Sequence, residues 1–245
     1  MKSDSSCIIL NKVNKFYGDK QVLKDVDLMV PYGSIYGLLG PSGCGKTTTV
    51  KIMAGILEAT SGETFVLGEK MPQLELMNQI GYMAQSDALY TVMTASENLE
   101  FFASLYGMKR LDIKKRVLEV MELVNLTEDL QKPVAAYSGG MKRRLSLAMA
   151  ILHNPKVLIL DEPTVGIDPL LRKDIWNELY KMTKKGVTIL ITTHVMDEAE
   201  KCHQLAMMRS GILIAEGTPI DLQKSIGVDN IEDAFIYYGG GIDED

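Results

Sequence analysis

The chain has 245 residues, of which 46% are hydrophobic and 24% charged, and its formal net charge is −6. This length is enough for one large α/β domain, or for a domain with an inserted lobe. An acidic chain without an evident basic face is a poor candidate for binding nucleic acid, because neutralising phosphates requires clustered Lys and Arg.

The apolar runs are much shorter than the about 20 residues that cross a bilayer, and no basic-then-apolar leader opens the chain. Cys7, Cys44 and Cys202 share no ligand-like spacing. We therefore expect neither a disulfide framework nor a zinc site. These features predict a protein that is either cytosolic or held to a membrane only through a partner.

Two strands are expected near the start, over residues 8–13 and 22–30, with residues 15–20 as their connection. Tyr17 lies in this connection, beside Gly18. Its ring either offers a face on which a base can stack or belongs to an ordinary half-buried surface tyrosine.

The stretch from Gly40 to Thr47 carries the pattern G-x-x-x-x-G-K-[ST] between an apolar run at 35–39 and a helix-compatible run at 48–57. Glycines let the main chain curl so that its N–H groups point at a polyphosphate, and the following helix start adds free donors and a positive dipole end. Lys46 is expected to reach the β- and γ-phosphates, and the Thr47 hydroxyl to bind Mg²⁺. A helix start also predicts a lowered thiol pKa for Cys44.

Residues 61–62 indicate a turn, and residues 63–67 and 80–84 indicate short strands, the second ending at Gln85. From residue 97 to 124 the apolar spacing changes from period two to period 3.6, which predicts a helical lobe inserted into the α/β core. Just before it, residues 87–94 mix apolar side chains with little polar relief. This segment is either an exposed patch for a partner or packing beneath the lobe.

Ser138, Gly139 and Gly140 precede a basic, strongly helical run that begins at Met141. Serine suits a helix N-cap, but a cap does not require a glycine pair. The pair therefore indicates that a bulky group approaches this helix start, which is a second start suited to an anion.

The apolar run 157–160 is expected to be a buried parallel strand that ends in Asp161 and Glu162. A carboxylate at the end of such a strand can hold Mg²⁺ that bridges to phosphate. Glu162 lies one residue further on, and is a candidate to accept a proton from an attacking water.

A helix is predicted over residues 169–182 with Trp176 in the core, and a buried strand over 187–192 that ends two residues before His194. A lone histidine after a strand is usually structural. His194 is nevertheless expected in the layer of strand ends that holds Gly40 and Asp161, where open α/β sheets place their ligands. Residues 205–208 and 212–215 predict a hairpin, 219–226 and 231–238 short helices, and 239–245 a disordered acidic tail.

The ordered set of motifs resembles the nucleotide-binding subunit of ABC transporters over about residues 8–217. These motifs are Gly40–Thr47, Gln85, Ser138–Gly140, Leu160–Pro163, Asp168 and His194. The segments YSGGMKRRL and IEDAF are most similar to ATPase subunits of two-component exporters of the daunorubicin-resistance type.

The resemblance implies an α/β fold of the P-loop NTPase class, with a RecA-like parallel sheet core. It also implies an antiparallel β subdomain, at about residues 6–34 and 60–70, and an inserted α-helical subdomain at about residues 87–150. All would belong to one ABC ATPase domain over residues 1–238.

The resemblance further implies roles for the matching positions. Tyr17 would stack on adenine, and Gln85 and Asp161 would complete the environment of Mg²⁺ and water. Glu162 would be the general base and His194 a switch that contacts the γ-phosphate. The nucleotide-binding loop would consist of Gly40, Pro41, Ser42, Gly43, Cys44, Gly45, Lys46, Thr47 and Thr48.

The remaining implied motifs are the signature, Ser138–Gly140, and the D-loop with Asp168. Tyr137 and Met141 stand where the signature usually has Leu and Gln, and Val165 where the D-loop commonly has Ser. The missing Gln puts one side-chain contact to the nucleotide in doubt, while the glycine–helix geometry survives.

The implied function is ATP binding and hydrolysis that powers export of a drug, antibiotic or other small hydrophobic compound through a separate permease. The protein would be peripheral on the inner face of the cell membrane. The permease is expected to dock near Ala88–Tyr90 and the helix that holds Phe101 and Phe102.

A homodimer is also expected. The phosphate-binding loop serves one side of an ATP, so the second helix start is best used on an ATP held by another copy, with two-fold symmetry.

Two other functions are compatible with parts of the sequence. A soluble ABC-type ATPase acting on ribosomes or nucleic acid usually has two ATPase modules or a long coiled-coil insertion, and this chain has neither. A regulator that no longer hydrolyses ATP is disfavoured by Glu162 and His194.

Overall fold

The computed structural model describes residues 6–86 and 88–240. The chain divides into two compact units, which are described separately below. The first contains residues up to 74 together with residues from 188 onward, and the second contains residues 75–187. The expected subdivision into β subdomain, helical subdomain and catalytic core stays a prediction.

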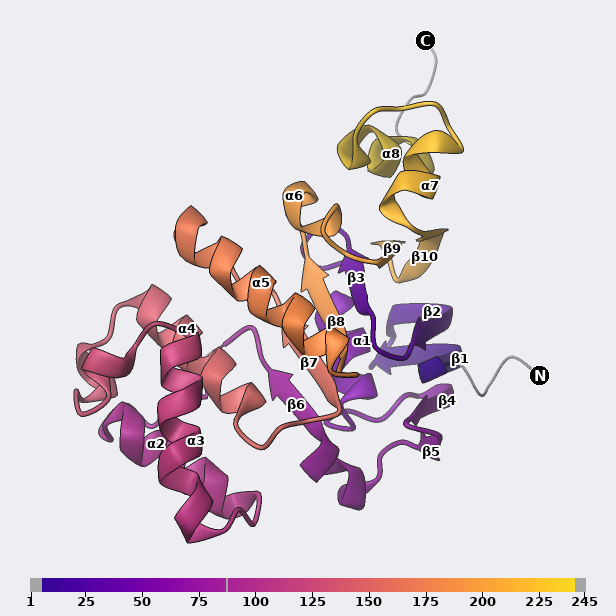
Figure 1. Ribbon diagram of the computed structural model, residues 1–245. Helices are drawn as coiled ribbons and strands as arrows, with labels where there is room; N and C mark the ends of the chain where they lie inside the picture. The colour runs from indigo at the N-terminus through magenta and orange to yellow at the C-terminus, as the bar shows by residue number, and fades with distance from the viewer. Residues whose placement is uncertain (1–5, 87, 241–245) are drawn as a thin grey trace. The chain divides into compact units, whose positions relative to one another are not determined.

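An antiparallel sheet opens the first unit. Its strands are β1 (Ser6–Tyr17), β2 (Lys20–Pro31), β4 (Ser61–Val66) and β5 (Glu69–Lys70), in the order β2-β1-β4-β5 (Figure 1). Both predicted strands at the start are present but longer than expected, so that only Gly18 and Asp19 connect them. The prediction of a turn at residues 61–62 was wrong, because both residues belong to β4. Glycine suits position 62, since a Cβ atom there would lie 2.3 Å from the Lys12 carbonyl oxygen on β1.

The first unit also holds the strand that leads into the predicted phosphate-binding loop. This strand, β3 (Ile35–Leu39), is fully buried and runs parallel to β8 (Thr188–Thr193) and β9 (Gln204–Arg209). Strand β10 (Ile212–Gly217) pairs antiparallel with β9, which confirms the predicted hairpin. The apolar runs therefore form a buried parallel arrangement, as such runs favour.

The helices of the first unit are α1 (Lys46–Met53), α6 (Met196–Ala199), α7 (Pro219–Lys224) and α8 (Ile231–Tyr238). Helix α1 starts two residues earlier than expected and ends four residues earlier. Ile231 and Ala234 of α8 pack in one apolar cluster with Leu39 and Leu205. Gly239 caps α8, and residues 241–245 of the predicted acidic tail lie outside the described residues.

The second unit contains the parallel pair β6 (Ile80–Met83) and β7 (Val157–Asp161). Its helices are α2 (Ala95–Leu105), α3 (Arg110–Leu123), α4 (Gly139–Ile151) and α5 (Pro169–Lys184), with short 3₁₀ turns η2 (Leu74–Gln79), η3 (Thr127–Asp129) and η4 (Val134–Ala136). Helices α2, α3 and α4 contact one another (Figure 1). The change of apolar spacing at residue 97 therefore located helices correctly.

Local signals explain where two of these helices begin. Thr94 and Glu97 form a reciprocal capping box at the start of α2, which satisfies two backbone donors. Asp168 accepts a hydrogen bond from the Leu171 amide, and Pro169 provides a preset φ at the first position of α5.

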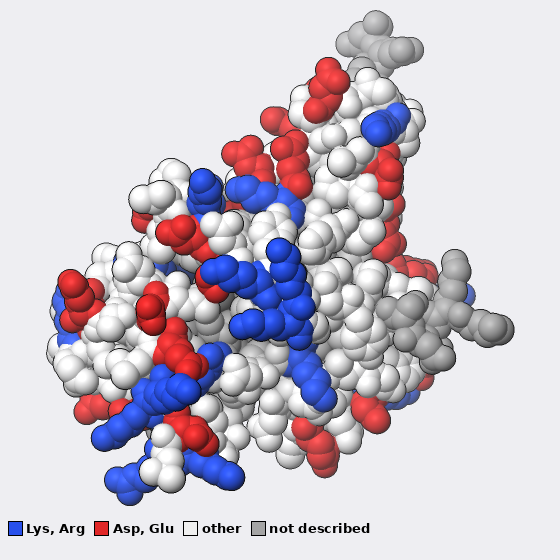
Figure 2. Space-filling view, in the orientation of Figure 1, with Lys and Arg blue, Asp and Glu red and all other residues white. Residues whose placement is uncertain are grey.

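Basic side chains gather at the C-terminal end of α5 (Figure 2), where the last turn carries Lys181 and Lys184. Positive charge at this end stabilises a helix through its dipole. Trp176 lies in the core at 2% exposure, as predicted. Within the described ranges, no helix combines the length and the apolar character that a membrane crossing needs.

Candidate active site

The predicted phosphate-binding loop joins β3 to α1, because β3 ends at Leu39 and α1 begins at Lys46. Gly45 caps α1 with a φ of 115°, in the left-handed region that favours glycine. At Gly40 a Cβ atom would lie 2.3 Å from the Met208 carbonyl oxygen. The loop therefore depends on glycine at both positions, once for conformation and once for space.

The Lys46 side chain lies across this loop. It is 5% exposed, and its Nζ donates to the carbonyl oxygens of Gly40 at 2.7 Å and Pro41 at 3.0 Å. Thr47 and Thr48 follow in the first turn of α1 and are half-buried. A cation, two hydroxyls and a helix start thus gather within one short segment, which is a suitable arrangement for a polyphosphate.

The Cys44 thiol does not have the lowered pKa that the sequence predicts. Its side chain is 4% exposed, and burial raises the pKa of the thiol, while the charge of Lys46 lowers that pKa by less. The prediction of a lowered pKa was wrong. Burial destabilises the thiolate by more than Lys46 and the nearby backbone donors stabilise it.

Strand β8 ends at Thr193, one residue later than predicted, so His194 directly follows the strand. The His194 side chain is exposed. In the parallel pairing of β3 with β8, Leu39 lies opposite Thr193, and the Gly40 amide donates to the Thr193 carbonyl oxygen at 3.3 Å. The structure therefore brings His194 to the start of the phosphate-binding loop.

Tyr17 is the last residue of β1 rather than part of a loop. Its ring is 51% exposed, and the Lys15 Nζ lies 5.3 Å from the ring centroid. An exposed ring on a firm strand end is available for stacking, while its role toward adenine stays a prediction.

In the second unit, Gln85 follows the end of β6, while Asp161 is the last residue of β7 and Glu162 comes directly after it. Met83 of β6 lies opposite Leu160 of β7, so the segments after them share one edge. The Gln85 Nε2 donates to the Glu162 Oε2 at 3.3 Å, and Asp161 is fully buried. Glu162 has a φ of 53°, so the chain turns sharply directly after the strand.

The predicted signature segment forms the start of α4. The Ser138 hydroxyl accepts a hydrogen bond from the Met141 amide at 3.2 Å, which makes this serine the N-cap. A Cβ atom at Gly139 would meet nothing within 4 Å among the described residues, while one at Gly140 would lie 3.2 Å from the Gly166 carbonyl oxygen. The open glycine is the place where another molecule can come close to the helix start.

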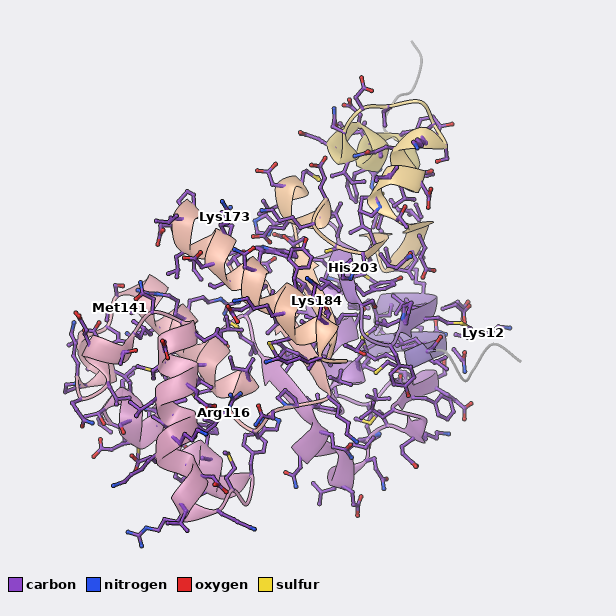
Figure 3. All side chains as sticks on the ribbon, in the orientation of Figure 1. Lys12, Arg116, Met141, Lys173, Lys184 and His203 are labelled. Carbon is purple, nitrogen blue, oxygen red and sulfur yellow. The ribbon has the colours of Figure 1, made fainter. Side chains whose placement is uncertain are left out.

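The departures from the family pattern have structural explanations in part. Tyr137 is 5% exposed and its hydroxyl donates to the Asp129 carbonyl oxygen at 2.9 Å, so it fills a core position with its polar tip satisfied. Met141 is half-buried on the first turn of α4 (Figure 3). Val165 is 46% exposed, in the turn before Asp168.

Arg143 is a residue whose importance the sequence reading missed. The sequence indicates only that it belongs to a basic helical run, yet Arg143 is 7% exposed and binds the backbone at the ends of β6 and β7. A signal was present, because positions 143, 147 and 150 lie on one helical face and Leu147 and Ala150 are core residues.

The sequence matches the family described as "ABC transporter" over residues 23–165, more than half of the chain. Together with the loop, the strand ends and the signature helix described above, this match shows that the chain belongs to the ABC transporter family, as an ATP-binding domain.

Two relatives carry names that are more specific. The chain is 39% identical over 232 residues to YbhF of Escherichia coli (strain K12), named a probable multidrug ABC transporter ATP-binding protein. The alignment covers 92% of this chain and 40% of that protein, so the chain spans less than half of that relative's length. It is 38% identical over 224 residues to the linearmycin resistance ATP-binding protein LnrL of Bacillus subtilis (strain 168), covering 89% of this chain and 71% of that protein.

A solved structure has the same fold. It is the post-hydrolysis dimer of the ATP-binding cassette MJ0796 bound to ADP and Pi, with a TM-score of 0.81 and 26% identity over 86% of this chain and 98% of that one. The expected P-loop NTPase fold class is thereby confirmed.

Proposed function

We propose that the chain is the ATP-hydrolysing subunit of an ABC exporter and that it drives transport through a separate membrane permease. The observation that carries the hydrolytic part is the pair of Gln85 and Glu162, joined at 3.3 Å beside the buried Asp161. A carboxylate oriented by an amide at the end of a strand can hold a water and take its proton. Glu162 is therefore assigned as the general base.

The first unit supplies the nucleotide site in this proposal. The backbone amides from Gly40 to Gly45 and the start of α1 bind the phosphates, and Tyr17 stacks on adenine. To reach the phosphates, Lys46 exchanges its bonds to the Gly40 and Pro41 carbonyls for bonds to phosphate oxygens. His194 stands beside the start of the loop and is assigned to the γ-phosphate.

Magnesium fits the donor atoms assigned to it. The Thr47 hydroxyl, the Gln85 amide oxygen and the Asp161 carboxylate are all oxygen donors, which Mg²⁺ prefers when it also binds phosphates. When bound, the ion would neutralise charge that develops on the phosphates.

In this proposal, a second copy of the chain contacts the start of α4, which Ser138 caps. The position of Gly139 leaves room for an approaching group, and the solved cassette with the same fold is a dimer. One copy's loop and the other copy's α4 would then bind the same ATP, with Asp168 nearby in the D-loop.

In this proposal, a cluster of aromatic rings on this chain forms the surface that contacts the permease. The rings of Tyr90 and Phe101 lie 5.3 Å apart and those of Phe101 and Phe102 lie 5.5 Å apart, in edge-to-face contact. Next to it, Ala88 and Phe102 line a cavity of about 90 Å³. Tyr90 is 47% exposed and Val92 89% exposed, which favours the reading of this segment as a partner surface.

The names of the relatives support export. One is named for multidrug transport and the other for resistance to linearmycin. Neither name supports the alternative of a soluble ATPase on ribosomes or nucleic acid. The cargo class proposed here is accordingly a drug, antibiotic or other small hydrophobic compound, and the protein acts at the inner face of the cell membrane.

The hydrolytic assignment is tested by phosphate release from the purified chain with ATP and Mg²⁺. Glu162→Gln should lower kcat by about 10²–10⁴-fold and leave ATP binding intact, because a general base acts only in the chemical step. Unchanged turnover in this variant would remove Glu162 from that role.

The permease assignment is tested by purification of the tagged chain from detergent-solubilised membranes of its host. An integral membrane protein should co-purify with the wild type and be lost with Phe101→Arg. Leu118→Arg on α3, where the side chain is 50% exposed, is the matched control and should retain it. Recovery with ribosomes or DNA instead would support the alternative function.

A further inference from the structure

Arg143 connects two backbone segments of the assigned hydrolysis site. Its Nη1 donates to the carbonyl oxygens of Ala84 at 2.7 Å and Gln85 at 2.9 Å. Its Nη2 donates to the carbonyl oxygens of Asp161 and, at 2.6 Å, Glu162. One guanidinium therefore binds the backbone after β6 and the backbone at the end of β7.

The side chain comes from the helix that begins at the signature. Arg143 is the fifth residue of α4, one turn after Ser138 and the open Gly139. The planar guanidinium has five donors in a fixed fork, so several bonds to carbonyls set its orientation firmly. The start of α4 is thus joined to both catalytic segments by the same rigid group.

The bond to Glu162 acts on a strained residue. Its φ of 53° lies in the left-handed region, which is unfavourable for a residue with a side chain and persists only where surrounding contacts hold it. The Arg143 Nη2 binds the carbonyl of this residue, and Gln85 binds its carboxylate. Arg143 therefore helps to hold the conformation that directs the Glu162 side chain.

Burial strengthens this arrangement. Arg143 is 7% exposed, and hydrogen bonds from a charged group are stronger and costlier to break where water is excluded. Arg144, its neighbour, instead binds the Val124 and Asn125 carbonyls at the end of α3, at 3.1 and 2.8 Å. Two adjacent arginines on one helix thus have different partners, which provides a matched comparison.

We propose that Arg143 is a positioning residue for ATP hydrolysis, which holds the backbone of Gln85 and Glu162 to helix α4 so that the general base moves together with the signature. This inference rests on the proposed function, because it assigns a role through Glu162. It deepens that proposal by naming the physical link between the helix that meets the second copy and the carboxylate that activates water.

The test compares steady-state ATP hydrolysis by the purified chain for the wild type, Arg143→Lys and the control Arg144→Lys. Lysine keeps the charge but cannot span four carbonyls with a planar fork. Arg143→Lys should lower kcat by about 10–100-fold, since displacement of a catalytic group by about 1 Å has such an effect, while the KM for ATP changes by less than about threefold. Arg144→Lys should keep kcat within about threefold.

A double-mutant cycle separates positioning from general structural damage. If Arg143 acts through Glu162, Arg143→Lys should change kcat by less than about threefold in the Glu162→Gln background. An equal loss of kcat in both backgrounds, a change confined to KM, or a wild-type kcat in Arg143→Lys would each overturn the inference while the role of Glu162 stands. If Glu162→Gln hydrolyses ATP at the wild-type rate, or the wild type has no activity, the proposed function fails and this inference fails with it.

Folding is monitored by the melting temperature of each variant. Should Arg143→Lys fail to fold, Arg143→Gln takes its place, because a glutamine amide can still bind one pair of these carbonyls. If neither variant folds, Arg143 is a folding residue and the proposal is overturned.

Discussion

At the scale of single residues, the clearest expected effect is that of replacing Lys46 on the affinity for ATP. Replacing it with Ala removes the ammonium group that lies across the loop, bound to the Gly40 and Pro41 carbonyls. We expect ATP affinity to fall at least about tenfold, because the β- and γ-phosphates lose a direct cation. Titration with a fluorescent ATP analogue measures this, and Lys51→Ala on the same helix serves as the control. Normal affinity in Lys46→Ala would contradict the assignment of the loop.

His153 predicts a pH dependence of stability. Its Nε2 donates to the Ile80 carbonyl oxygen at 3.1 Å, and its ring stacks on Tyr106 at a centroid distance of 3.7 Å. Burial lowers the pKa of His153 from 6.5 to about 4. Between these two pH values His153 binds a proton in the unfolded chain but not in the folded chain. The contribution of neutral His153 to the free energy of unfolding is therefore complete above pH 6.5 and is lost as the pH falls toward 4.

The measurement is the melting temperature at pH 7 and pH 5, by circular dichroism. His153→Phe keeps the stacking on Tyr106 and cannot titrate, so its melting temperature should fall less between these two pH values than that of the wild type. If both proteins show the same difference, His153 is not the group responsible.

Residues also show what sequence alone could and could not predict. The glycines and Lys46 follow from the needs of a phosphate, and the structure has the glycines between β3 and α1 and Lys46 at the first position of α1. The pKa of Cys44 was predicted in the wrong direction, because burial at 4% exposure depends on Gly40 and other groups that pack around it in space. Arg143 was missed for a similar reason, since its four acceptors lie 18 or more residues away along the chain.

At the scale of elements, α3 and α4 cap each other's C-terminal ends with arginine. Arg116 of α3 donates to the Leu152 carbonyl at 2.9 Å and the Ile151 carbonyl at 2.6 Å, where α4 ends (Figure 3). Arg144 of α4 does the same for the end of α3. Cations that bind the last carbonyls of a helix also complement its dipole. The two helices are therefore fastened to each other as well as packed.

This reciprocal capping can be measured by urea denaturation. Arg116→Ala should lower the free energy of unfolding by about 1–3 kcal/mol, because two buried carbonyl oxygens lose a charged donor. Lys115→Ala next to it, whose side chain is 83% exposed, should change it by less than about 0.5 kcal/mol. A loss in Arg116→Ala no larger than that of the control would mean that packing alone holds the helices together.

Element boundaries were less predictable than element types. The strands at 35–39 and 157–160 and the hairpin near the end of the chain follow from apolar runs and turn residues, which are local signals. The lengths of β1 and β2 do not, because several shifts of register between them let the pairing continue through polar residues up to Tyr17. Gly62 likewise suggested a turn, and its real reason is the close approach of the neighbouring strand.

At the scale of the whole molecule, the proposal requires two copies to share each ATP. Glu162→Gln with ATP and Mg²⁺ should sediment as a dimer, since bound nucleotide is no longer removed by hydrolysis. Adding Gly139→Trp should abolish this dimer and leave ATP binding to the monomer intact. The indole has room within its own copy, but it would block the approach of the second copy to the start of α4. Lys114→Trp on the exposed face of α3 is the control. A persistent dimer with Gly139→Trp would place the second copy elsewhere.

The buried Trp176 gives this chain an optical signal of its own. It is the single tryptophan of the sequence, and it sits on α5, the helix that Asp168 caps, with the Tyr180 ring 6.0 Å away. Indole emission depends on the polarity and packing around the ring, so its spectrum reports on that one helix without any attached dye. Stopped-flow emission after mixing with nucleotide would then time the response of α5 in unlabelled, unmodified protein.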